Sequence, residues 1–181
     1  MLTKAEIGRK LWGPHSGGSE NAIYVLLEML GQAESDAEFW RIFQIGWPNA
    51  NVSWSWRGLM HGMLANRPPA CEFLEGKDKE LYDSLPDTVD VYRGSSSERA
   101  VGLAWTTDLE IAQQFARGYG GAFVPSPVIA SAKIPKSAIF TVIMDRNEYE
   151  ILLDSEQLVG LEVAPYPSLD QDKQPAALAS D

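Results

Sequence analysis

The sequence predicts an α+β protein in which helices precede a β-rich core. Across residues 22–85, apolar side chains recur at spacings of three and four, which gives each predicted helix one face to bury. The pattern changes at residues 85–87, and residues 88–94 alternate with period two, as strands do. We therefore expect an N-terminal helical region over residues 1–87 that packs on a core over residues 88–164. The Pro-, Asp-, Gln- and Ala-rich residues 165–181 predict a flexible tail.

Capping and stop signals set the bounds of the helices predicted before residue 88. Ser19 precedes the first of them and Gly31 ends it, and a capping box at residues 35–38 precedes the second. Ser53 opens the third, which a Pro-Pro pair closes at residues 68–69. Its Trp and Met side chains are more typical of a buried face than of a cofactor site. The helices are expected at residues 22–30, from the capping box to Gly46, from Ser53 to the proline pair, and at 77–85.

The second part of the chain predicts short strands and one helix. Asp108 is a good N-cap for a helix over residues 109–116. Glycines and prolines make residues 118–127 a flexible loop. Because those glycines do not follow a strand and open a helix, they are not a dinucleotide-binding fingerprint. Strands are expected at residues 88–94, 102–107, 128–134, 138–144, 148–153 and 160–164.

Composition narrows the classes of function. The net charge is −10 and the isoelectric point about 4.6, so we expect no direct nucleic-acid binding, although a local Arg can still bind a small anion. The acidity favours a basic protein partner. The single cysteine, Cys71, excludes an internal disulfide, and His15 and His61 stand far apart, so we expect no metal site. Without a signal-peptide pattern or an apolar run of membrane length, we expect a protein with no membrane contact that is cytoplasmic, either in the cell that produces it or in a target cell to which it is delivered.

The segment Glu148-Tyr149-Glu150 runs into an apolar triplet and stands out as a candidate site. If a strand begins at Glu148, both carboxylates point the same way, because side chains alternate along a strand. One carboxylate could then stabilise a cationic transition state while the other handles an acceptor. The alternative is a solvated strand edge with both acids outward and Tyr149 inward. The chain has neither a Gly-x-Ser-x-Gly elbow nor a Walker loop, which disfavours a classical hydrolase or a P-loop enzyme.

The order of three short motifs resembles the arginine, Ser-Thr-Ser, Glu-x-Glu class of mono-ADP-ribosyltransferases, the cholera-toxin-like branch. The resemblance covers residues 88–164. Residues 91–94, Val-Tyr-Arg-Gly, match the first motif; residues 104–116 resemble the second motif and its following helix; residues 148–150 match the third. Where the family has Ser-Thr-Ser, this chain has Trp105, Thr106 and Thr107. The resemblance implies a split, mixed β-sandwich with NAD in its cleft and helices at its flank.

The family's chemistry assigns roles to residues at matching positions. Glu150 would be the catalytic carboxylate that faces the oxocarbenium-like state when the nicotinamide–ribose bond breaks. Glu148 would contact the acceptor, and Arg93 would hold the pyrophosphate bidentately. The cofactor-binding set implied by the resemblance is Arg93, Gly94, Trp105, Thr106, Thr107, Tyr119 and Phe123, and the substrate-recognition turn is Arg146, Asn147 and Tyr149.

Each assignment has an ordinary structural alternative. Arg93 could be a surface salt bridge at a strand end, and the threonines could pack as β-branched strand residues. Tyr119 and Phe123 could be exposed loop aromatics without a partner.

We therefore expect an enzyme that transfers ADP-ribose from NAD, its co-substrate, to a side chain of a protein target. Its size and acidity suit a small bacterial or phage effector that inactivates a basic, nucleic-acid-handling protein. One alternative is an NAD glycohydrolase, in which water replaces the acceptor. Another is a catalytically inactive binding or inhibitor module on the same fold, against which the presence of both Glu148 and Glu150 argues.

Overall fold

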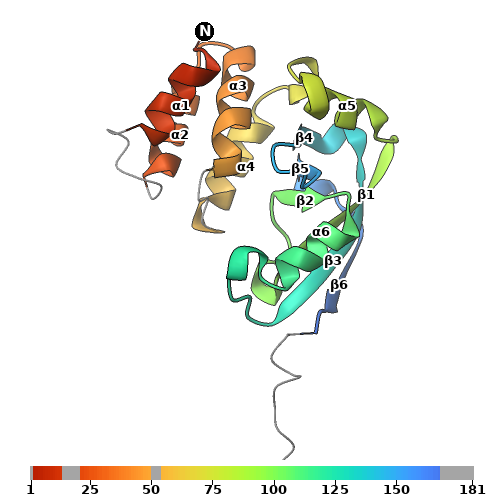
Figure 1. Ribbon diagram of the computed structural model, residues 1–181. Coiled ribbons are helices and arrows are strands. Elements are labelled where there is room, and N and C mark those ends of the chain that lie inside the picture. Colours follow the sequence, from red (N-terminus) through yellow and green to blue (C-terminus); the bar gives the residue numbers. More distant parts are fainter. Residues whose placement is uncertain (1, 14–20, 50–53, 168–181) are drawn as a thin grey trace, which may run out of the picture.

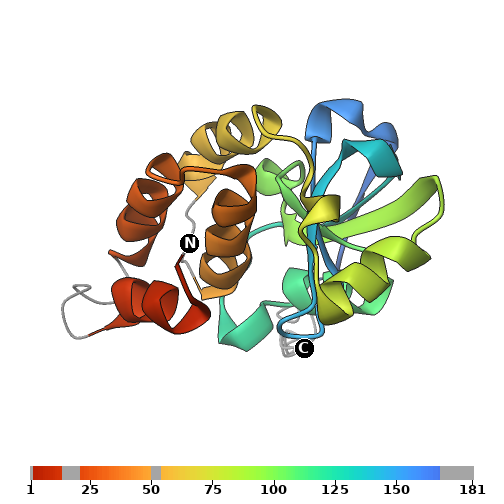
Figure 2. The same cartoon turned by 90° about the horizontal axis from the view of Figure 1, so that it is seen from above.

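A computed structural model describes residues 2–13, 21–49 and 54–167 of the chain. Helices α1–α4 gather on one side of a β-sheet, α5 lies near the β4 end of the sheet, and α6 packs against it (Figures 1 and 2). The helices are α1 Lys4–Trp12, α2 Ala22–Gly31, α3 Asp36–Gly46, α4 Arg57–Ala65, α5 Gly76–Ser84 and α6 Leu109–Ala116. The strands are β1 Thr88–Ser96, β2 Ala104–Thr106, β3 Pro127–Pro135, β4 Ile139–Ile143, β5 Glu150–Leu153 and β6 Val159–Pro165. This is the predicted α+β class.

The six strands form one open sheet in the order β4-β5-β2-β1-β3-β6. Every pairing between the described strands is antiparallel, so the expected mixed pairing is wrong, and one sheet takes the place of the expected two-layered sandwich. The sheet is narrow at its middle, where β1 and β2 pair at Tyr92 and Thr106. By contrast, β1 pairs with β3 along its whole length. The sheet therefore consists of two halves, β4-β5-β2 and β1-β3-β6, joined at a short junction.

Local signals account for most of the helices. Ser35 caps α3 by accepting a hydrogen bond from the Glu38 backbone N–H at 3.2 Å, and Asp108 caps α6, as predicted. Helices α2 to α5 lie within one to four residues of their expected bounds, although Ser19 and Ser53 lie outside the described residues. Helix α1 was not predicted. It begins with a complete capping box, in which the Thr3 hydroxyl accepts from the Glu6 N–H and the Glu6 carboxylate accepts from the Thr3 N–H.

The helical region and the sheet share one continuous set of buried apolar side chains. Trp40 and Phe43 of α3 are buried in it. In the third predicted helix Met60 is buried, and Trp56 and Met63 are partly buried against the core, so the predicted core role is confirmed for Met60 and in part for the other two. The sheet extends past the expected start of the tail: Pro165 still belongs to β6, and the Tyr166 N–H donates to the Pro127 carbonyl at 2.8 Å. Residues 168–181 lie outside the described ranges.

Gly94 allows α6 to lie directly on β1. A Cβ at position 94 would stand 1.7 Å from the Ala112 carbonyl oxygen and 2.6 Å from the Ala116 nitrogen, both of them main-chain atoms of α6. Because no side-chain rotation can relieve such a contact, the glycine is required by packing alone.

We predict that Gly94→Ala destabilises the protein by about 3 kcal/mol, since α6 must move away from the sheet to make room. Gly62→Ala is the matched control, because nothing lies within 4 Å of a Cβ at this position in α4. It should stabilise by about 0.5–1 kcal/mol through the better helix propensity of Ala. Urea unfolding of the three proteins measures both effects. Equal stability of Gly94→Ala and the parent would contradict this packing.

Candidate functional site

The three sequence motifs meet where the two halves of the sheet join. Glu150, the first residue of β5, pairs with Thr106 of β2, and Thr106 pairs with Tyr92 of β1. Arg93 is the next residue along β1. The register therefore brings the Arg, Thr and Glu motifs to one row across neighbouring strands, although they lie far apart in the sequence.

Glu150 has an unusual environment for a carboxylate. Its Oε1 accepts a hydrogen bond from the indole Nε1–H of Trp47 at 2.9 Å. Burial raises the pKa of Glu150 to about 7. The Trp47 bond opposes that rise, the charge of Glu148 adds to it, and the charges of Arg146 and Arg93 oppose it. Near neutral pH this carboxyl is therefore divided between its protonated and its ionised form.

Arg93 lies at the junction with its guanidinium against main chain. Its Nε donates to the Arg99 carbonyl at 3.2 Å and its Nη1 to the Ala104 carbonyl at 2.5 Å, so it holds the segment between β1 and β2. Gly102 gives it room, since a Cβ there would stand 2.8 Å from the Arg93 Cζ. Burial lowers the pKa of Arg93 to about 10, against the opposing attraction of Glu150, so the group stays cationic at neutral pH. These contacts differ from those of the surface salt bridge that was the alternative.

A tight turn separates Glu148 from the strand. Asn147 and Tyr149 both have left-handed backbone, with φ of 54° and 48°, and β5 begins only at Glu150. The expectation that the strand begins at Glu148, with both glutamates alternating along it, is therefore wrong. Glu148 is 6% exposed, and its Oε2 accepts from Arg146 Nη2 at 3.1 Å. Its Oε1 is buried and has no hydrogen-bond partner among the described residues.

The residues that replace Ser-Thr-Ser contact the main chain. The Thr106 hydroxyl donates to the Glu148 carbonyl at 2.8 Å and accepts from the Asp108 N–H at 3.1 Å. The Thr107 N–H donates to the Tyr149 carbonyl at 3.4 Å. Trp105 is 2% exposed, and its indole N–H donates to the Gly102 carbonyl at 2.8 Å. This segment holds the turn before Glu150, and the Thr106 hydroxyl bonds to main chain and not to the Glu150 carboxylate.

The loop after α6 presents its aromatic residues to solvent. Phe123 is 80% exposed, and Tyr119 is 47% exposed with its ring 5.0 Å from that of Phe115. Neither residue has a described contact with Arg93 or Glu150, so the structure does not bring them together with the central row.

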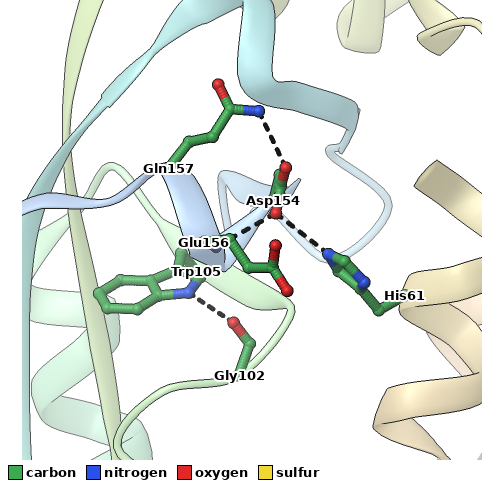
Figure 3. Close-up of polar contacts among 6 residues, drawn as sticks. All are labelled: His61, Gly102, Trp105, Asp154, Glu156 and Gln157. Carbon is green, nitrogen blue, oxygen red and sulfur yellow. Dashed lines mark hydrogen bonds and ion pairs between the residues drawn. The ribbon is translucent and has the colours of Figure 1, made fainter.

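Asp154, directly after β5, is a polar centre that sequence reasoning missed (Figure 3). Its Oδ1 lies 3.0 Å from His61 Nε2 of α4, and its Oδ2 accepts from Gln157 Nε2 at 2.8 Å. Burial raises the pKa of Asp154, but hydrogen bonds from Gln157, His61 and the Glu156 N–H outweigh it and hold the pKa below its usual range. Neither Trp47 nor His61 carried a local signal, because each contact joins residues about a hundred positions apart.

A cavity of about 770 Å³ lies between α1, α3, α5 and the end of β4. Asp78 stands at its wall and accepts a hydrogen bond from the Met144 N–H at 2.7 Å. Burial and the nearby Asp145 raise the pKa of Asp78. The cavity thus reaches the first residues of the turn that carries Glu148. Its charged and amide lining residues are Lys4, Arg41, Gln44, Glu72, Glu75, Lys77, Asp78 and Asp145.

Comparisons of the chain with protein-family models, with curated proteins and with solved structures gave no match. Within the described residues, no group of three or more His, Cys, Asp and Glu side chains is arranged to hold a metal ion. In the same part of the chain, no helix is long and apolar enough to cross a membrane.

The raised pKa of Glu150 predicts a dependence of stability on pH. The unfolded chain releases this proton near pH 4.5 and the folded chain near pH 7, so the folded state binds more protons between these values. Stability should therefore fall as pH rises from about 4.5 to 7 by on the order of 3 kcal/mol, since one pKa unit corresponds to about 1.4 kcal/mol. Glu150→Gln keeps an acceptor for Trp47 and removes the charge. It should raise the melting temperature at pH 8 and leave it nearly unchanged at pH 4.5.

The control for this experiment is Glu162→Gln, at an exposed position on β6. Calorimetric melting of the parent and both variants at the two pH values gives the comparison. A Glu150→Gln variant that is no more stable than the parent at pH 8 would mean that the carboxylate is not desolvated.

Proposed function

We propose that the chain is an NAD-dependent mono-ADP-ribosyltransferase that modifies a side chain of a protein target. The observation that carries the proposal is that a half-buried carboxylate and a half-buried guanidinium, Glu150 and Arg93, lie at the same junction of the sheet. The charge of each moves the pKa of the other toward its ionised form. Strongly shifted ionisable groups with opposite charges are characteristic of functional sites. The motif order of the sequence adds the reaction class to this geometry.

Glu150 would supply the electrostatic stabilisation. When the bond between nicotinamide and ribose breaks, positive charge develops on the ribose, and a nearby carboxylate favours that charge in a site of low dielectric. Only the ionised form of Glu150 does this. With a pKa of about 7, a substantial share of the carboxyl is ionised at neutral pH. Arg93 supports the proposal as the cation for the pyrophosphate, because its guanidinium has further N–H groups beyond the two bonded to main chain.

Glu148 and its turn would serve the acceptor. The buried Oε1 of Glu148 has no hydrogen-bond partner among the described residues, so it can accept from an incoming nitrogen or oxygen nucleophile. The acceptor attacks the ribose carbon as nicotinamide leaves, and the proton that the acceptor loses passes to Glu148. Tyr149, 39% exposed at the same turn, and Asn147 would meet the target surface. The net charge of −10 favours a basic partner protein.

The direct test is incubation of the protein with labelled NAD and a bacterial lysate, followed by gel separation. We expect label on a lysate protein, and Glu150→Gln should reduce both labelling and NAD hydrolysis by about 10²–10³. Glu162→Gln is the matched control and should label as the parent does. Turnover of NAD by Glu150→Gln at the parent rate would refute the proposed site.

Glu148→Gln separates transfer from hydrolysis. Labelling of the target should be lost while slow NAD hydrolysis survives, because water needs less positioning than a side chain. Removing the charge of Glu148 also lowers the pKa of Glu150, so the surviving hydrolysis should extend to lower pH.

A parent protein that hydrolyses NAD without labelling any protein would be a glycohydrolase, with Glu148→Gln close to parent activity. A parent without either activity would fit an inactive binding module. Undiminished labelling by Glu148→Gln would exclude the acceptor role of Glu148.

A further inference from the structure

Both ends of β5 are bonded to the helical region. At the first residue, Glu150 Oε1 accepts from Trp47 Nε1–H at 2.9 Å. Immediately after the last residue, Asp154 Oδ1 lies 3.0 Å from His61 Nε2 (Figure 3). Trp47 follows α3 and His61 belongs to α4, so two helical elements hold one four-residue strand.

We propose that Trp47 is a positioning residue that orients and ionises the Glu150 carboxylate, which makes the helical region a part of the active site. The kinetic half of this inference rests on the proposed transferase or hydrolase activity. The structural half, that the Trp47 indole controls the protonation of Glu150, stands independently of it.

The described side chains of β2, the strand that pairs with β5 at Glu150, do not donate the hydrogen bond to the Glu150 carboxylate. Thr106, the cross-strand partner of Glu150, has its hydroxyl bonded to the Glu148 carbonyl and the Asp108 N–H. The indole N–H of Trp105 is bonded to the Gly102 carbonyl. The described side-chain donor to Glu150 therefore comes from outside the sheet.

The core holds the Trp47 ring in place. Its backbone N–H bonds to the Phe43 carbonyl at the end of α3, and its ring stacks on that of Phe43 at 5.3 Å and 21°. Phe43 is fully buried, and Gly46 lets α3 pack so closely on α2 that a Cβ there would stand 2.4 Å from Leu26 Cδ1. The direction of the indole N–H thus follows from helix packing and costs no additional ordering on catalysis.

The chemistry of the indole determines what the bond does. An indole N–H only donates, so Trp47 cannot take the proton of Glu150, and its bond is stronger to the ionised carboxylate than to the acid. It opposes the effect of burial on the pKa of Glu150. Without it, a smaller share of Glu150 would be ionised at neutral pH, and the carboxylate would lose its fixed direction.

The first test needs no enzymatic activity. In a ¹H–¹⁵N NMR titration of the intact protein, the Trp47 indole signal is identified by its loss in Trp47→Phe. It should shift with a midpoint near pH 7, the pKa of Glu150, and it should stop titrating there in Glu150→Gln. The Trp40 indole, which belongs to α3 and is bonded to the Pro68 carbonyl after α4, is the control and should not follow this midpoint. A Trp47 signal that does not respond to pH between 5 and 9 would overturn the inference, whatever the activity.

The second test uses kinetics. Trp47→Phe keeps the ring stack on Phe43 and removes the donor, so the acid limb of the pH–rate profile should move up by about one pH unit. At pH 7 kcat should fall about fivefold, because the ionised share of Glu150 drops from about one half to about one tenth, and it should recover toward the parent at pH 9, with KM for NAD nearly unchanged. Trp40→Phe, which removes an indole donor from the core, should lower stability without moving the limb.

The two inferences fail in different ways. An unchanged acid limb in Trp47→Phe would exclude the positioning role, while an inactive parent would exclude the proposed function and leave the NMR titration to decide the role of Trp47.

Discussion

The partial removal of the Glu150 carboxylate from water is the constraint on which the rest of the site depends. A buried carboxylate without compensation is costly, and proteins usually respond by protonating it. Here Arg93, Arg146 and the Trp47 N–H offset part of this cost, while Glu148 adds to it, and the result is a group balanced between its two forms. A group at this balance responds strongly to small changes nearby. Each neighbour therefore acts by changing the share of the Glu150 carboxyl that is ionised.

The narrow middle of the sheet explains why these groups meet. A sheet with full pairing between β1 and β2 would fill the space around the junction with main-chain hydrogen bonds. Instead, Arg93 bonds the carbonyls of Arg99 and Ala104, and Thr106 bonds the main chain on both of its sides. At the junction, side chains thus satisfy main-chain hydrogen-bonding groups that are paired strand to strand elsewhere in the sheet. Arg93, one of the polar groups that close the junction, is also the group to which the proposed function assigns the charged substrate.

Sequence reasoning succeeded where the signals are local. The caps at Ser35 and Asp108 and the alternation from Thr88 onward each depend on neighbours within a few residues. The capping box of α1 was equally local, but α1 buries few side chains, Ile7 and Leu11 among them, and so shows little apolar periodicity.

The start of β5 was misplaced because the left-handed turn at Asn147 and Tyr149 contains no glycine that would have indicated it in the sequence. The Arg, Thr and Glu motifs could be placed together only by resemblance, and the contacts of Trp47 and His61 required the fold itself.

The long separation of the Trp47 and Glu150 partners also has a consequence for biosynthesis. The two residues are 103 positions apart, and His61 and Asp154 are 93 apart, so the helical region leaves the ribosome long before β5 exists. Contacts of such high sequence separation form late, after their loop-closure entropy has been overcome. A nascent chain that ends before β5 has its helices but lacks Glu150. Premature termination or early proteolysis before β5 would therefore yield fragments without the central carboxylate, and assembly of the site would have to wait for the synthesis of β5.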